Sequence, residues 1–229
     1  VQTDYHEKLN AITSFDDRIA ELTAQKETLY DKVIKQAAVL TKLRSQSGQH
    51  IERQMQSLLV PLGMPNVRFV VELNPRKEPD SKGMDSVTFL FSANKNGTLQ
   101  NVASVASGGE IARVMLSLKA MIAGAVKLPT IIFDEIDTGV SGSIAEKMAL
   151  IMQEMGKQNR QVISITHLPQ IAALADTHLL IAKGERDGRT YTTVTPLDRE
   201  GRKLELARII GGASITEITL KSAEEMLTS

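Results

Sequence analysis

Three short segments of the chain carry residues of the types that bind phosphate and activate water. They are Ala106-Ser107-Gly108-Gly109-Glu110, Ile131-Ile132-Phe133-Asp134-Glu135, and His167 at the end of another apolar run. In this order they indicate the second half of a site that hydrolyses a nucleoside triphosphate. The first half is not in this sequence, because no G-x-x-x-x-G-K-[ST] loop occurs between Val1 and Ser229.

The glycine-containing segment has two interpretations. Ser107 and Glu110 are spaced as a capping box, which would satisfy two free backbone N–H groups at a helix start. The cap does not explain Gly108 and Gly109, since two glycines in a first turn cost stability. Their benefit would be close approach of a phosphate to the positive end of the helix. The segment alone leaves both interpretations open.

Asp134 and Glu135 follow an apolar run that we expect to be a buried strand. The carboxyl end of such a strand is where α/β sheets place ligands, and a buried unpaired carboxylate would need a cation or a donor. Because neighbours on a strand point opposite ways, Asp134 would face Mg²⁺ or its water and Glu135 an attacking water. The alternative is that both carboxylates cap a helix or close the turn before Thr138-Gly139.

His167 ends a second apolar run, residues 162–165, and stands just before Leu168-Pro169. An isolated histidine there is more often a cap or a buried hydrogen-bonding group. At a strand end beside Asp134 and Glu135 it could instead reach the γ-phosphate. Asp137 lies in the loop after Glu135, which could simply turn the chain.

Composition narrows the function classes. Lys plus Arg and Asp plus Glu number 27 each, so the net charge is zero and gives no sign of nucleic-acid binding. The aromatic content of 3% argues against a surface on which nucleic-acid bases stack. The absence of cysteine excludes a disulfide scaffold and a thiolate zinc site and suits a reducing cytosol. No apolar run approaches the roughly 20 residues of a membrane span, so we expect no membrane partner.

Residues 1–60 differ from residues 61–229 in composition and in the spacing of their apolar residues. The first region has no proline and a single glycine, and its apolar residues follow a heptad repeat that predicts a coiled-coil helix. Eight of its ten seam positions are apolar; the ten are Ile12, Phe15, Ile19, Leu22, Lys26, Leu29, Val33, Gln36, Leu40 and Leu43. The alternative is an amphipathic helix packed on its own domain. A helix of this length would need a second coiled-coil strand that these 229 residues do not contain.

After residue 61 the pattern predicts an α/β fold. Residues 67–73 and 87–92 alternate as strands, and the linker 74–83 is expected to be a mobile loop. Helices and strands then alternate, which implies a parallel sheet covered by helices. The expected helices are 108–123, 143–155, one from 169, 202–210 and 216–227, and the expected strands are 130–133, 161–165, 178–182 and 190–195. The helix from Gly108 is expected to bury Ile111, Val114, Met115, Leu118 and Ile122.

These motifs resemble the ABC-type ATPases. Ala-Ser-Gly-Gly-Glu is similar to their signature motif, Ile-Ile-Phe-Asp-Glu to their Walker B strand, residues 136–142 to the D-loop, and Thr166-His167 to the switch histidine. The sequences of residues 89–94, 102–113, 133–142 and 165–171 resemble more closely one branch of these ATPases, the bacterial SMC-like DNA repair ATPases. The implied fold is α/β: the C-terminal half of an ABC-type P-loop ATPase head (61–229) with a long N-terminal coiled-coil helix, the returning arm (1–60).

The resemblance also implies roles for individual residues. Ser107, Gly108, Gly109 and Glu110 would contact ATP bound to a second head, Asp134 would hold Mg²⁺ directly or through water, and Glu135 would polarise water. His167 would contact the γ-phosphate, and Asp137 would couple the two sites of a head homodimer.

For the intact protein the resemblance implies an ATPase of recombinational double-strand-break repair in the cytoplasm, at the nucleoid, with DNA as a partner. The Walker A half of the same protein would complete the head, and this chain alone would be inactive. A nucleotide-binding subunit of another ABC-type machine and a non-catalytic coiled-coil scaffold are the alternatives.

Overall fold

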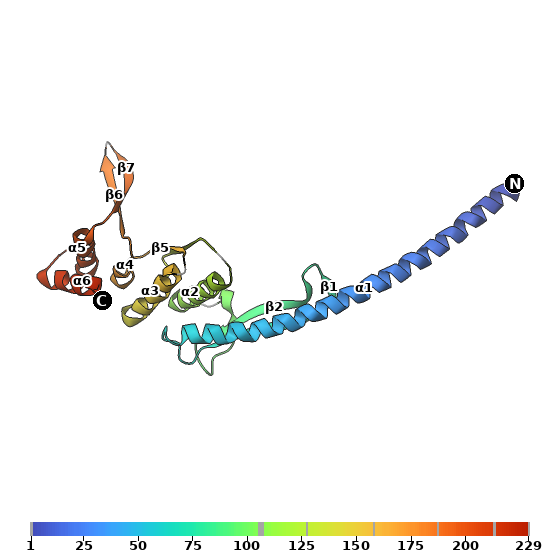
Figure 1. Cartoon of the computed structure of the whole chain (residues 1–229), viewed down its shortest axis with the longest axis horizontal. Helices are drawn as coiled ribbons and strands as arrows, with labels where there is room; N and C mark the ends of the chain where they lie inside the picture. The colour runs from blue at the N-terminus through green and yellow to red at the C-terminus, as the bar shows by residue number, and fades with distance from the viewer. Residues whose placement is uncertain are drawn as a thin grey trace. The chain divides into compact units, whose positions relative to one another are not determined.

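The computed structural model describes residues 2–104, 108–126, 128–157, 159–186, 188–212 and 214–228; for residues 2–14 and 186 it describes the backbone alone. The chain divides into two compact units, one of residues 1–52 and 70–89 and one of residues 53–69 and 90–229. Figure 1 labels most of their elements along the colour gradient. Among the described residues, no helix combines the length and apolar character that a bilayer crossing requires.

Most of helix α1, Gln2–Leu59, belongs to the first unit, and its last turns from Arg53 belong to the second. Its 58 residues correspond to about 87 Å at 1.5 Å per residue, and the absence of proline allows this length. Several apolar seam residues are exposed, among them Phe15 at 66% and Leu29 at 59%. The single glycine, Gly48, lies where a Cβ atom would stand 3.2 Å from the side chain of Val71.

A β-hairpin lies along α1 in the same unit. Strand β1, Arg68–Asp80, and strand β2, Gly83–Ser92, extend through the segment that the sequence predicted to be a mobile loop, so that prediction is wrong. Pro75 and Pro79 are compatible with β1 because this strand forms the edge of the sheet β1-β2-β3. The turn is closed by Asp80, whose Oδ1 accepts the Lys82 N–H at 2.7 Å, and by Gly83 at φ 101°.

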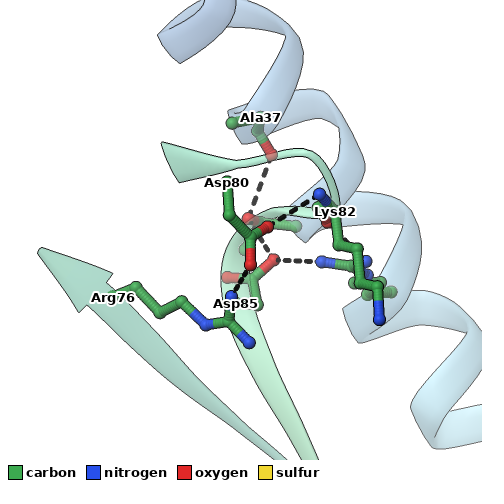
Figure 2. Close-up of polar contacts among 7 residues, drawn as sticks. Ala37, Arg76, Asp80, Lys82 and Asp85 are labelled. Atoms are coloured by element: carbon green, nitrogen blue, oxygen red, sulfur yellow. Dashed lines mark hydrogen bonds and ion pairs between the residues drawn. The ribbon is translucent and has the colours of Figure 1, made fainter. Parts of the chain in front are cut away.

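Polar contacts attach this hairpin to the helix (Figure 2). Asp85 of β2 is 7% exposed, and its Oδ2 accepts from the Thr41 hydroxyl at 2.7 Å and from Arg44 at 3.3 Å. Arg44 also donates to the Lys82 carbonyl oxygen at 2.7 Å. The buried carboxylate is thus paired and hydrogen-bonded, as a charge inside a protein must be.

The second unit contains the remaining elements and two hydrophobic clusters. After β3, Gln100–Asn101, and the short helix η1, Val102–Ser104, come α2, Gly108–Ala125; β4, Thr130–Asp134; α3, Gly142–Lys157; β5, Gln161–Ile165; and α4, Pro169–Ala173. The larger cluster joins α2, β4, α3 and α4 around Leu116, Phe133 and Met148, each 0% exposed. The smaller joins α4 to α5, Arg199–Gly211, and α6, Glu217–Thr228, around Leu206 and Ala223.

Strands β4 and β5 pair in parallel, as expected, with Asp134 opposite Ile165. Strand β6, Leu179–Arg186, does not extend this pair in the described part of the chain. It pairs antiparallel with β7, Arg189–Pro196, and Figure 1 shows the two as a hairpin. The short connection from Arg186 to Arg189 explains the antiparallel pairing of β6 with β7, because a parallel pair would need a much longer crossover.

Helix α2 begins and ends close to its predicted bounds, and its buried face only partly matches the predicted one: Val114 is buried as expected, whereas Ile111 and Leu118 are half-buried. Its buried residues are Gly109, Ala112, Val114, Leu116, Ser117 and Ala123. Met115 and Ile122, expected in the core, are 39% and 48% exposed. Small residues dominate the buried stripe, which allows the helix to approach its neighbours closely.

Candidate functional site

The carboxyl ends of β4 and β5 bring the predicted catalytic segments to one edge of the sheet. The parallel register ends with Asp134 opposite Ile165, and the Glu135 N–H continues the ladder by donating to the Ile165 carbonyl oxygen at 3.1 Å. The Thr166-His167 segment therefore begins beside Glu135. This arrangement follows from the parallel pairing that the apolar strands predicted.

Asp134 and Glu135 are both exposed in this chain. The expectation that these carboxylates are buried is therefore wrong, since β4 alternates and its buried positions are Ile131 and Phe133. A cation at Asp134 stays a prediction. Glu135 lies outside the strand at φ 47°, a left-handed conformation that is uncommon for a side-chain-bearing residue. Strand alternation consequently does not determine where its side chain points. Backbone strain of this kind clusters at functional sites.

The turn after Glu135 is fixed by hydrogen bonds. The Thr138 hydroxyl donates to the Glu135 carbonyl oxygen at 2.8 Å, and the Val140 N–H donates to the Asp137 carbonyl oxygen at 3.1 Å. These bonds hold the D-loop segment in a compact turn and aim the Asp137 side chain inward, where it is 1% exposed.

Asp137 and His167 meet across the two loops that follow β4 and β5. The Asp137 Oδ1 atom lies 3.7 Å from Nδ1 of His167, and its Oδ2 accepts a hydrogen bond from the Thr166 hydroxyl. The His167 side chain is 68% exposed, so one edge of the ring faces a buried carboxylate while the ring remains accessible. Sequence reasoning gave Thr166 no role, although its hydroxyl directly before the histidine was the available signal.

The start of α2 contacts the D-loop segment. A Cβ atom on Gly109 would lie 2.6 Å from the Gly139 carbonyl oxygen, whereas one on Gly108 would meet nothing within 4 Å. Gly108 is exposed, Gly109 is buried and Glu110 is half-buried. Ser107, the remaining predicted nucleotide contact, lies outside the described residues.

A divalent cation at this edge of the sheet would need oxygen ligands. Within the described residues, no group of three or more His, Asp or Glu side chains could hold a metal ion. Mg²⁺ is commonly held by one or two carboxylates together with substrate phosphates and water. The exposed Asp134 carboxylate at the end of β4 therefore fits such a cation as a single protein ligand.

The fold defines the class of protein. An Smc head domain with a coiled coil and joint from Pyrococcus yayanosii matches with a TM-score of 0.56 and 21% identity, over 90% of this chain and 34% of that one. A structure from work on ATP-driven dimerisation and DNA-stimulated activation of SMC ATPases matches with a TM-score of 0.50 and 21% identity, over 76% of this chain and 98% of that one. The chain has the fold of part of an SMC-type head with a long coiled-coil helix, as the motifs implied.

Comparison with curated sequences identifies closer relatives than the comparison of folds does. The DNA repair protein RecN of Vibrio cholerae is 36% identical over 93% of this chain and 38% of its own length. RecN of Halalkalibacterium halodurans is 38% identical over 96% of this chain and 40% of its own length. The chain is thus similar to the C-terminal portion of RecN along nearly all its residues. It spans about two fifths of the length of these relatives, and no family model matches it.

Proposed function

We propose that the intact protein is an SMC-like ATPase of recombinational double-strand-break repair and that this chain supplies the signature and Walker B side of its head. The observation that supports this most is the parallel register of β4 and β5, in which Glu135 donates its N–H to Ile165 beside Thr166-His167. A water-activating carboxylate and a phosphate-contacting histidine belong on neighbouring strand ends in such a site.

Glu135 and His167 divide the chemistry. The exposed Glu135 carboxylate accepts a proton from the attacking water, a contribution of roughly 10²–10⁴-fold in rate. His167, exposed at 68%, presents its ring to the γ-phosphate. Asp134 would hold Mg²⁺ directly or through water, and the cation would supply charge neutralisation at the phosphates.

The start of α2 would serve a nucleotide held by a second head. Gly108 has open space around it, so a phosphate could approach its backbone closely. Ser107, Gly109 and Glu110 complete this segment by resemblance, and ATP binding would drive two heads together until hydrolysis releases them. The Walker A loop would come from the N-terminal half of the same protein. Residues 1–229 alone should therefore not hydrolyse ATP.

Residues 1–60 would form the returning arm of an antiparallel coiled coil, and residues 61–229 the C-terminal lobe of the head. The exposed seam on α1 supports the arm, because Phe15, Ile19 and Leu22 are 66%, 61% and 47% exposed and suit a partner helix. The RecN relatives are named as DNA repair proteins. DNA as the partner, and the cytoplasmic nucleoid as the location, follow from that similarity.

The test is steady-state Mg²⁺-dependent ATP hydrolysis by the full-length protein with and without linear double-stranded DNA. We expect turnover that DNA stimulates. Turnover indifferent to DNA would favour another ABC-type machine, and the absence of turnover would favour a coiled-coil scaffold. Residues 1–229 assayed alone serve as the inactive control.

A further inference from the structure

The His167 ring is held only loosely by contacts of its own. It is 68% exposed, and Nδ1 lies 3.7 Å from Oδ1 of Asp137, which is too long for a hydrogen bond. An exposed side chain that must meet a phosphate loses rotamer freedom when it does so. The backbone that carries His167 therefore determines where the ring can reach.

The Thr166 hydroxyl fixes that backbone. It accepts the Leu168 N–H at 3.0 Å, so the side chain of one residue closes a short turn onto the backbone two residues later. His167 is the central residue of this turn. Helix α4 begins directly after it, and the Ile171 N–H donates to the Leu168 carbonyl oxygen at 3.2 Å. The histidine thus stands between a hydrogen-bonded turn and the start of a helix.

The same hydroxyl joins this turn to the loop after β4. It donates to Oδ2 of Asp137, whose side chain is 1% exposed and whose Oδ1 has no hydrogen-bond partner within the described residues. In that part of the chain Thr166 supplies the hydrogen bond that this buried carboxylate has, and losing it would leave the carboxylate without a donor, which is costly. The Val140 N–H holds the Asp137 carbonyl oxygen at 3.1 Å. The turn around His167 is therefore anchored to a fixed point.

We propose that Thr166 is a positioning residue whose hydroxyl holds the backbone of His167 against the loop that begins at Glu135. The hydroxyl uses its donor and one acceptor position within the protein, so it acts through His167 rather than on a nucleotide. Asp137 follows Glu135 by two residues, so one short frame carries both proposed catalytic side chains. The consequence for hydrolysis rests on the proposed ATPase function, whereas the turn itself does not.

Hydrogen exchange of the Leu168 amide tests the turn in the full-length protein. NMR with ¹³C-carbonyl histidine and ¹⁵N-leucine labels selects His–Leu pairs, of which this chain has His167-Leu168 and His178-Leu179. His167→Gln assigns the first pair by removing its signal. We expect exchange at Leu168 to be roughly fivefold faster in Thr166→Val than in wild type, because one hydrogen bond is lost. Thr166→Ser should keep the wild-type rate.

The controls lie in the same unit. The Leu179 amide reports any general loosening and should not change. Thr130→Val removes a hydroxyl that donates to Gln161 Oε1 at 3.2 Å, at the other end of β4, and should leave Leu168 exchange as in wild type. Unchanged exchange in Thr166→Val would overturn the proposal. So would a Leu168 amide that is unprotected in the wild type, a result that decides even if Thr166→Val fails to fold.

Kinetics test the positioning role. Thr166→Val should lower kcat by roughly 10²-fold through misplacement of His167, with little change in the KM for ATP, and Thr166→Ser should restore it. An unchanged kcat would reject the role. Thr166→Val should cost nothing further in a His167→Gln background, and equal losses in both backgrounds would show that Thr166 does not act through His167. A wild type without ATP hydrolysis would reject the proposed ATPase, while Leu168 exchange would still decide the turn.

Discussion

Gly109 and Gly139 lie against each other so closely that neither can carry a side chain without displacing the other. A Cβ atom on Gly109 would stand 2.6 Å from the Gly139 carbonyl oxygen, and one on Gly139, which has φ 76°, would stand 3.2 Å from the Gly109 nitrogen. The contact joins the start of α2 to the loop after β4. The position of the signature segment therefore depends on the D-loop segment.

Gly109→Ala should destabilise the second unit by about 1–3 kcal/mol, because the clash is with backbone that cannot rotate away. Gly108→Ala, where a Cβ would meet nothing within 4 Å, is the matched control and should stay within about 0.5 kcal/mol of wild type. Urea unfolding of the full-length variants measures both. Equal stability of the two variants would contradict the contact.

Asp85→Ala should destabilise the hairpin against α1. The buried carboxylate accepts from both Thr41 and Arg44, and hydrogen bonds to a charged group contribute about 1.5–3 kcal/mol. Glu78→Ala removes an exposed carboxylate from the same hairpin and should change little. Hydrogen exchange of the β2 amides reports the loss directly, and unchanged protection in Asp85→Ala would argue against this role.

His178 should make stability depend on pH. Burial lowers the pKa of His178, the Arg202 guanidinium lowers it further, and Glu205 raises it. Above the unfolded-state pKa of about 6.5, His178 is neutral in both the folded and the unfolded chain and does not affect stability. Below that pH the unfolded chain binds a proton that the folded chain binds less readily, so stability falls as the pH falls.

The melting temperature of wild type should therefore fall more between pH 7.5 and 5.5 than that of His178→Gln. His50→Gln changes an exposed histidine on α1, keeps His178 and should retain the wild-type loss. Identical losses in wild type and His178→Gln would show that His178 does not cause the dependence.

Ser107→Arg should prevent two heads from engaging around ATP, because a long cationic side chain would fill the space that the γ-phosphate of the second head occupies. This prediction rests on the resemblance to the signature motif. Light scattering of the full-length protein with ATP in a Glu135→Gln background measures the assembly. Ser57→Arg, at an exposed position on α1, should still assemble, and ATP-dependent assembly of Ser107→Arg would contradict the role.

Much of the fold could be predicted because hydrophobic spacing records which faces are buried. The heptad repeat of apolar residues predicts the long helix α1. The two apolar runs, each followed by polar residues, predict the parallel pair β4–β5. The two strands of the hairpin were predicted, but not their extension through residues 74–83. Pro75 and Pro79 indicate a loop, and only the position of β1 at a sheet edge makes them compatible with a strand.

The sequence predicts which residues belong to the candidate site, but not their backbone conformations or their contacts with one another. Motif order identified Glu135 and His167, but not that Glu135 leaves the strand at φ 47° or that Asp137 is buried against His167. Those features depend on contacts between loops that lie about thirty residues apart along the chain, as the Thr166 to Asp137 hydrogen bond shows. Local periodicity contains no information about such pairs.

Glu135 is proposed to activate water for ATP hydrolysis, and the most direct measurement compares full-length Glu135→Gln with wild type. Turnover should fall by roughly 10²–10⁴-fold, while binding of a fluorescent ATP analogue remains. Glu154→Gln, which changes an exposed carboxylate 3.6 Å from Lys157 on α3, is the matched control and should hydrolyse ATP normally. Undiminished turnover in Glu135→Gln would remove Glu135 from the reaction and contradict the account.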